Sequence, residues 1–219
     1  VDELYDVLED IYSEMMNNFS PPAFHMGGDE IFFSCWNSSD SLKDWMSERG
    51  WGGENKTQDD FMKLWGYFQK KALERLDKVS GKKVPIVLWT SELTEEPHLT
   101  EHLDKDRYII QMWSEKQSPH TKELLEKGYR VIISNYDTLY LDCGFGNWAG
   151  DSLIWCGPYN NWNKIYQNKM ETFSNGTELL PLIYGAEATI WSESIDEHNL
   201  HSRLWPRISA LAERLWSSK

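Results

Sequence analysis

Short apolar runs, separated by stretches with helical spacing, constrain the fold of this chain most. The runs contain β-branched and aromatic residues and lie at 23–26, 84–89, 108–113, 130–135 and 182–187. Helical spacing is found at 1–19, 60–78, 119–127, 162–173 and 200–217. Strands that are apolar throughout and alternate with helices are typical of a parallel sheet covered on both faces. The predicted fold class is therefore α/β, either a doubly wound sheet or a (β/α)8 barrel.

The residues at and after the ends of these runs favour the barrel. Neither a G-x-G-x-x-G pattern nor a P-loop follows any run, so the usual sign of a nucleotide-binding doubly wound sheet is missing. Carboxylates and aromatic residues follow the runs instead, and a barrel places its active site at the carboxyl ends of its strands. These residues are Asp29, Glu30, Trp89, Trp113, Tyr140, Asp142, Trp191 and Glu193.

The composition excludes several classes of protein. The chain has 22 Lys and Arg against 35 Asp and Glu, a net charge of -13. This acidity gives no electrostatic footprint for nucleic acid or for an anionic membrane surface. Apolar residues make up 40% of the chain, enough for a core, and no run is long enough to span a membrane. The 12 tryptophans favour a carbohydrate ligand, because their rings stack on sugars.

Sequons and cysteines indicate the secretory pathway, and an extracellular protein more than a lysosomal one. Glycosylation is predicted at Asn37, Asn55 and Asn175; Asn18 also begins a sequon, but it lies at a helix end close to Pro21.

The cysteines predict one internal disulfide. Cys143 and Cys156 flank a loop rich in glycine and tryptophan and are expected to form it, the alternative being two buried free thiols. Cys35 is then left over, so it is either a free thiol or bonded to a cysteine outside this chain.

Asp29 and Glu30 are adjacent and directly follow a Gly-Gly pair at the end of a predicted strand. Two neighbouring carboxylates in a partly dry pocket cannot both ionise cheaply, so one pKa is expected to rise. A carboxylic acid that stays protonated near neutral pH can act as a general acid. The alternative is a solvated acidic turn.

These residues resemble those of a known family. The sequence from His25 to Glu30, H-M-G-G-D-E, is similar to the H-x-G-G-D-E signature of family 20 glycoside hydrolases, the β-N-acetylhexosaminidases. Segments 36–39 and 144–148 look most like the insect and arthropod chitinolytic branch. Further segments that resemble the family follow in order at 88–89, 112–113, 140–144, 191–193, 205–207 and 212–216.

The resemblance implies exo-acting, retaining hydrolysis of terminal non-reducing β-linked N-acetylglucosamine, from chitooligosaccharides or glycoconjugates. The 2-acetamido group of the substrate would serve as nucleophile, an exception to the two-carboxylate scheme. Glu30 would be the general acid and then base, and Asp29 would hold the acetamido nitrogen. Tyr140 would donate its hydroxyl to the acetamido oxygen and direct it at C1.

The same resemblance implies the substrate-binding residues. Asp142 and Glu193 would bind hydroxyls at the far side of the terminal sugar, Trp155 would stack on the next sugar, and His25 would support the carboxylates. The tryptophans expected to enclose the terminal sugar are Trp89, Trp113 and Trp191.

Two other functions remain open: a catalytically inactive carbohydrate-binding protein on the same scaffold, and a structural secreted domain. No cofactor is expected. No metal cluster is expected either, because the histidines are scattered along the sequence. His98 and His201 are interpreted as surface residues without convergent partners.

The whole chain, 1–219, is predicted to be an incomplete catalytic TIM-barrel domain. The family places its signature at the end of the fourth strand, whereas here only 24 residues precede His25. A strand-helix-strand unit takes about 30 residues, so three earlier strands do not fit. We expect the C-terminal part of the barrel, about strands 4 to 8, completed by a companion N-terminal chain or segment and disulfide-linked through Cys35. We also expect the assembled enzyme to be a homodimer.

Overall fold

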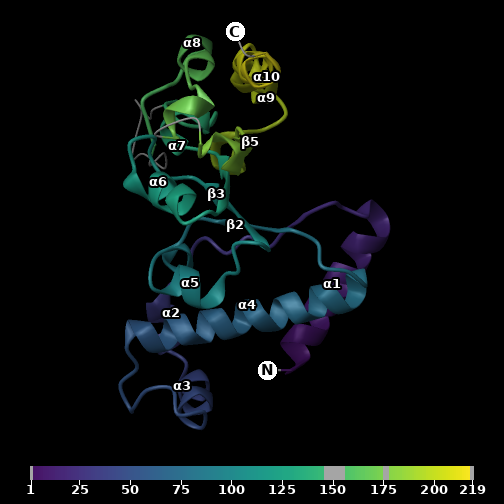
Figure 1. Ribbon diagram of the computed structural model, residues 1–219, viewed down its shortest axis with the longest axis vertical. Helices are drawn as coiled ribbons and strands as arrows, with labels where there is room; N and C mark the ends of the chain where they lie inside the picture. Colours follow the sequence, from purple (N-terminus) through teal and green to yellow (C-terminus); the bar gives the residue numbers. More distant parts are fainter. Residues whose placement is uncertain (1, 146–155, 175–177, 218–219) are drawn as a thin grey trace. The chain divides into compact units, whose positions relative to one another are not determined.

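The computed structural model describes residues 2–145, 156–174 and 178–217 (Figure 1). The chain divides into two compact units, Val1–Tyr108 and Ile109–Lys219. Both units contain parallel strands connected by helices, which confirms the predicted α/β class. Among the described residues, no helix is long and apolar enough to cross a membrane.

The first unit contains a pair of short parallel strands and a long helix. The register places Phe24 opposite Ile86 and His25 opposite Val87. The elements of this unit are α1 (Asp2–Phe19), β1 (Phe24–His25), α2 (Phe33–Asn37), α3 (Asp40–Ser47), α4 (Gln58–Ser80), β2 (Ile86–Trp89), η1 (Glu92–Thr94) and α5 (His98–His102).

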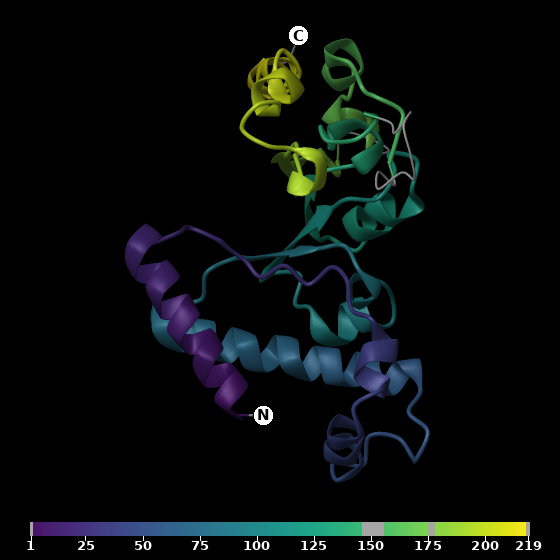
Figure 2. The same ribbon diagram turned by 180° about the vertical axis from the view of Figure 1, so that it is seen from behind.

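Helix α4 has clear start and stop signals. Thr57 and Asp60 form a capping box at its N-terminus, which satisfies two otherwise free backbone donors. Gly81 ends the helix at φ 64°, a left-handed conformation that glycine adopts without steric cost. Helix α1 packs across α4 (Figures 1 and 2) and also covers β1, because the ring of Tyr12 lies 5.3 Å from that of Phe24.

The second unit contains the remaining strands, and all its pairings are parallel. Strand β3 pairs with β4 from Ile109 opposite Arg130 to Met112 opposite Ile133, and β4 pairs with β5. The elements are β3 (Tyr108–Met112, whose first residue belongs to the first unit), α6 (Pro119–Glu126), β4 (Arg130–Ile133), α7 (Tyr136–Leu139), α8 (Trp162–Tyr166), η2 (Met170–Thr172), η3 (Leu180–Leu182), β5 (Ile183–Ala186), η4 (Ser192–Ser194), α9 (Leu200–Leu204) and α10 (Arg207–Trp216).

The five predicted strands are all present, and two predicted helices are divided. The stretch 162–173 forms α8 and then a separate turn of 3-10 helix, and the stretch 200–217 forms α9 and α10. Pro206 lies between α9 and α10, where its missing N–H and its ring interrupt a continuous helix. Helices α2, α3, α5 and α7 were not predicted, because they are short and lie outside the stretches with helical spacing.

Candidate active site

The turn after β1 carries the first group of predicted site residues. The N–H of Gly27 donates to Nδ1 of His25 at 3.0 Å, and the N–H of Trp89 donates to the carbonyl of Gly27 at 3.0 Å. The second of these bonds joins the carboxyl ends of β1 and β2. The ring of His25 lies 5.3 Å from that of Trp89. His25 thus supports the turn that carries the carboxylates.

Glycine is required in this turn. Gly27 and Gly28 have φ values of 70° and 79°, which other residues adopt only with strain. A Cβ on Gly28 would also lie 3.3 Å from Cδ2 of Leu88. Asp29 and Glu30, which follow, are both exposed. The partly dry pocket that we expected around this pair is therefore not found among the described residues of the first unit.

In the second unit, Tyr140 lies beside the segment that follows β5. Tyr140 forms a parallel bridge with Thr189, and the N–H of Leu141 donates to the carbonyl of Thr189 at 2.8 Å. The side chain of Tyr140 is buried, at 4% exposure. This pairing fixes the backbone that presents Tyr140 and Asp142.

A row of aromatic rings surrounds Tyr140. Its ring centroid lies 6.1 Å from that of Trp191 and 6.5 Å from that of Tyr136, and Tyr136 lies 6.5 Å from Trp113. The hydroxyl of Tyr136 donates to Glu115 at 2.7 Å, and this bond raises the pKa of Tyr136 to about 12. Trp191 is 40% exposed and so offers part of its ring face to a ligand. The structure thus brings together three of the predicted aromatic site residues: Trp113, Tyr140 and Trp191.

Asp142 is partly buried, and its carboxylate is incompletely bonded. The pKa of Asp142 is raised, mainly by burial and also by the nearby charge of Glu193. The backbone N–H of Trp191 donates to the carboxylate and lowers the pKa in part. Oδ1 of Asp142 is buried and has no hydrogen-bond partner among the described residues. A sugar hydroxyl would be a suitable donor to this oxygen. Glu193 itself is exposed.

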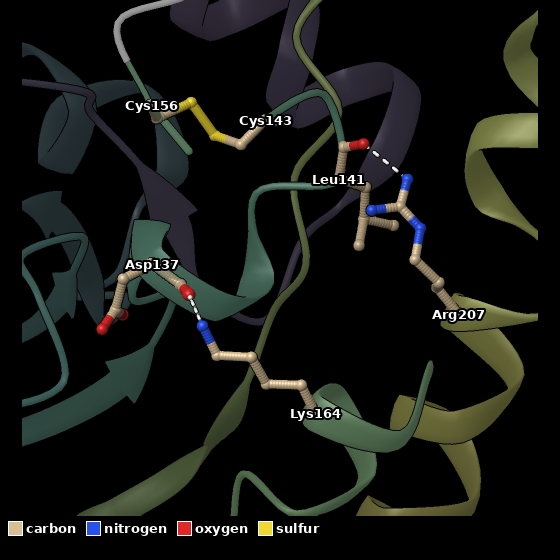
Figure 3. The surroundings of a disulfide bond; sticks show 6 residues. All are labelled: Asp137, Leu141, Cys143, Cys156, Lys164 and Arg207. Carbon is tan, nitrogen blue, oxygen red and sulfur yellow. Dashed lines mark hydrogen bonds between the residues drawn. A yellow bond between two sulfur atoms is a disulfide. The ribbon is translucent and has the colours of Figure 1, made fainter. Parts of the chain in front are cut away.

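A disulfide and a buried arginine hold the segment around Asp142 (Figure 3). Cys143 and Cys156 are bonded, which confirms the predicted pairing. Arg207 is 1% exposed and donates to the carbonyls of Leu141 at 2.5 Å and Asn160 at 3.3 Å. Burial lowers the pKa of Arg207. The guanidinium thus ties the start of α10 to the backbone beside Asp142.

The remaining predicted residues are exposed or lie outside the described part of the chain. Asn37 and Asn55 are exposed, as glycosylation requires, and their modification stays a prediction. Cys35 is exposed and free. Trp155 and Asn175 lie outside the described residues.

The second unit contains a buried polar network that was not predicted from the sequence. Gln111 donates to Oγ of Ser134 at 2.8 Å, and Ser134 donates to the carbonyl of Glu187 at 3.0 Å. Asn168 donates to Oδ1 of Asn135 at 3.0 Å. A polar residue within an apolar run, such as Gln111, is the signal that could have indicated it.

The expectation that His98 has no convergent partner is wrong. Ligand atoms of His98, Glu101 and His102 lie within 4.8 Å of one another, so these side chains could hold a metal ion. The spacing of the three residues in the sequence is itself the signal that was overlooked. Asp142, Cys143 and Cys156 also cluster, but the two sulfur atoms form the disulfide.

Carboxylates and tryptophans at the carboxyl ends of parallel strands are typical of an enzyme of the (β/α) barrel class, which carries its active site there. The family model described as glycosyl hydrolase family 20, catalytic domain, matches residues 1–219. The chain belongs to this family.

Curated relatives agree with this assignment. Over 99% of this chain, the sequence is 50% identical to the chitooligosaccharidolytic β-N-acetylglucosaminidase of Ostrinia furnacalis. It is 48% identical to the enzyme of the same name from Bombyx mori, also over 99% of this chain. It is 30% identical to the human β-hexosaminidase subunit beta over 98% of its length. The chain spans 36% of each of the two insect proteins and 34% of the human subunit, about a third of their lengths.

Solved structures show the same fold. The chain superimposes on a family 20 exo-β-N-acetylglucosaminidase from Vibrio harveyi, in complex with N-acetylglucosamine, with a TM-score of 0.75 and 22% identity. The match covers 98% of this chain and 31% of that one. The fold is therefore α/β with parallel strands and corresponds to part of the barrel, as predicted.

The unpaired oxygen of Asp142 yields a prediction about stability. In the folded protein the pKa of Asp142 is raised, so the folded state binds more protons than the unfolded state and stability falls as pH rises through this range. Asp142→Asn removes the charge, and we expect it to raise the free energy of unfolding at pH 7 by up to about 1 kcal/mol. The gain should vanish below about pH 3.9, the pKa of an unfolded aspartate.

Thermal unfolding across this pH range measures the effect, and Glu171→Gln, at an exposed carboxylate, is the control. A destabilised Asp142→Asn variant at pH 7 would show that the negative charge is satisfied in the folded protein.

Proposed function

We propose that this chain forms part of an exo-acting β-N-acetylhexosaminidase that releases terminal, non-reducing β-linked N-acetylglucosamine. The observation that carries the proposal is the glycine turn after β1, which presents Asp29 and Glu30 as exposed neighbours and is hydrogen-bonded to both His25 and Trp89. The names of the two insect relatives make chitooligosaccharides the favoured substrates.

Each step of the reaction has a residue suited to it. Glu30 gives its proton to the glycosidic oxygen while the acetamido oxygen of the substrate attacks C1, so the leaving sugar departs as an alcohol and an oxazolinium ion forms. Asp29 accepts a hydrogen bond from the acetamido N–H and stabilises the positive charge. Tyr140 donates to the acetamido oxygen, which places it near C1. Glu30, now a carboxylate, takes a proton from the water molecule that attacks C1. This attack breaks the bond between C1 and the acetamido oxygen, so the oxazolinium ring opens and the anomeric configuration is retained.

Polar and aromatic residues at and after the strand ends suit the terminal sugar. Oδ1 of Asp142 is buried and accepts nothing from the described residues, so a sugar hydroxyl can bond to it. With Glu193, it closes the far side of the sugar and limits cleavage to chain ends. Trp89, Trp113 and Trp191 enclose this sugar, and Trp155 stacks on the next sugar of the substrate.

A companion segment completes this catalytic domain. Leu4, Val7, Ile11 and Met15 recur along one side of α1 and are 42% to 57% exposed, although the helix already packs on α4 with its other side. An amphipathic helix rarely leaves a second apolar stripe in water. An N-terminal barrel segment would cover this stripe and is disulfide-linked through the exposed Cys35.

The assembled enzyme is proposed to be an extracellular homodimer of the secretory pathway. The disulfide, the exposed asparagines of two sequons and the acidic surface suit this compartment.

Replacement of Glu30 tests its role as the acid. In the complete enzyme, Glu30→Gln should lower kcat about 10² to 10⁴-fold on chitobiose, because a poor leaving group needs protonation. The loss on an activated aryl N-acetyl-β-glucosaminide should be smaller. The exposed Glu48→Gln is a matched control and should leave both rates unchanged.

Equal losses on the two substrates would rule out Glu30 as the acid. If the unaltered enzyme turns over neither substrate while still binding N-acetylglucosamine, the protein is a carbohydrate-binding protein instead.

Expression of residues 1–219 with and without the upstream segment of the same protein tests the companion. The chain alone should have no turnover and should expose the apolar stripe of α1 to a hydrophobic dye, and joint expression should restore activity. Non-reducing peptide mapping should find Cys35 bonded to an upstream cysteine. Full activity of residues 1–219 alone would contradict the proposal.

A further inference from the structure

We propose that His98, Glu101 and His102 of α5 form a zinc site that is separate from the sugar site. The sequence His98-Leu99-Thr100-Glu101-His102 places the two histidines one helical turn apart and the glutamate beside the second. Two histidines at i and i+4 on one helix face are a known arrangement for binding Zn²⁺. Zinc suits this set because it prefers imidazole nitrogen and carboxylate oxygen.

The three side chains already lie close enough to share one ion. Their ligand atoms are all within 4.8 Å of one another, and Nε2 of His102 lies 4.0 Å from Oε2 of Glu101. The two imidazole rings are nearly parallel, at 3°, with centroids 6.2 Å apart. Zinc bonds of about 2.0–2.1 Å place tetrahedral ligand atoms about 3.4 Å apart. Small side-chain rotations are therefore enough to close the site.

Two imidazole nitrogens in this cluster lack partners. Nδ1 of His98 and Nε2 of His102 are buried, and neither has a hydrogen-bond partner in the part of the chain that the structure describes. Buried polar atoms are almost always paired, so two such nitrogens on adjacent side chains require an explanation. A bound metal ion would satisfy both at once, and the carboxylate of Glu101 would offset part of its charge.

Helix α4 fixes the ring of His102 from the opposite side (Figure 1 shows α5 beside α4). A Cβ on Gly66 would lie 2.5 Å from Cε1 and Nδ1 of His102, so only glycine leaves room for the ring. Glycine inside a helix lowers helix stability relative to alanine. Its presence at this point of α4 is explained by the need to hold His102 in place, which pre-orients a metal ligand.

A cavity beside the cluster leaves room for a fourth ligand. It has a volume of about 270 Å³, and Glu101, His102, Lys70, Asp104 and Arg107 are among the residues that line it. Three protein ligands and one open position describe a zinc site that keeps a water or takes a small anion.

The cavity lies away from the strand ends that carry the sugar-site residues. The carbonyl of Arg107 accepts from the N–H of Ile86, the first residue of β2, whereas Trp89 ends that strand. The amino ends of barrel strands serve stability rather than catalysis. The zinc would link His98 and His102 of the short helix α5 and stabilise the folded protein by binding to it, and the proposal does not depend on the sugar chemistry.

Zinc titration of the full-length protein, after removal of metal by a chelator, tests this site. Equilibrium dialysis should find one Zn²⁺ per chain, and the melting temperature should rise when zinc is added. Glu101→Gln and His98→Asn should each raise the Kd for zinc at least about 10-fold. They should also abolish the rise in melting temperature.

His198→Asn is the matched control, because His198 lies 3.6 Å from Glu197 but is 84% exposed. It should bind zinc as the unaltered protein does. Glu101 is exposed, so its replacement should leave the metal-free melting temperature unchanged and separate loss of the site from loss of the fold.

Three results would overturn the proposal. The first is that the unaltered protein binds no zinc, and the second is that Glu101→Gln and His98→Asn bind it with unchanged affinity. The third is that His198→Asn loses the metal as fully as they do. Turnover of chitobiose is not a readout of this test, so its outcome is independent of the proposed function.

Discussion

The parallel direction of the strands is the constraint on which the rest of this structure depends. Within each unit, parallel pairing places the carboxyl ends of neighbouring strands at one edge. The first unit therefore brings the His25–Glu30 turn next to Trp89, and the second brings Tyr140 next to Trp191. Strand pairing thus makes neighbours of residues that lie far apart in the sequence.

Stability and the proposed function make opposite demands on the site residues of the second unit. Arg207 is buried and donates hydrogen bonds to backbone carbonyls, so it holds the segment that presents Asp142. Asp142 keeps an unpaired buried oxygen and a raised pKa, which weakens the fold in the absence of a ligand. In the proposed sugar site a hydroxyl would satisfy this acceptor, and the disulfide between Cys143 and Cys156 constrains the neighbouring backbone.

Local patterns predicted the strands of this chain and suggested its candidate site residues, but they did not predict the contacts that depend on tertiary packing. Apolar runs located every strand, and the His25–Glu30 motif located the carboxylates. The division of 200–217 at Pro206 could have been predicted, because proline interrupts a helix. The partners of Arg207 and the contact between Gly66 and His102 could not, because they join segments whose approach no local pattern encodes.

The central claim is that Asp29 and Tyr140 orient the substrate's own acetamido group as the nucleophile. Its most direct test is the affinity of the complete enzyme for a thiazoline analogue of the cyclic intermediate. We predict tight binding to the unaltered enzyme and, for Asp29→Asn and Tyr140→Phe, at least about 10²-fold weaker binding of the analogue, with a much smaller change for N-acetylglucosamine. Unchanged affinity for the analogue in both variants would contradict the account.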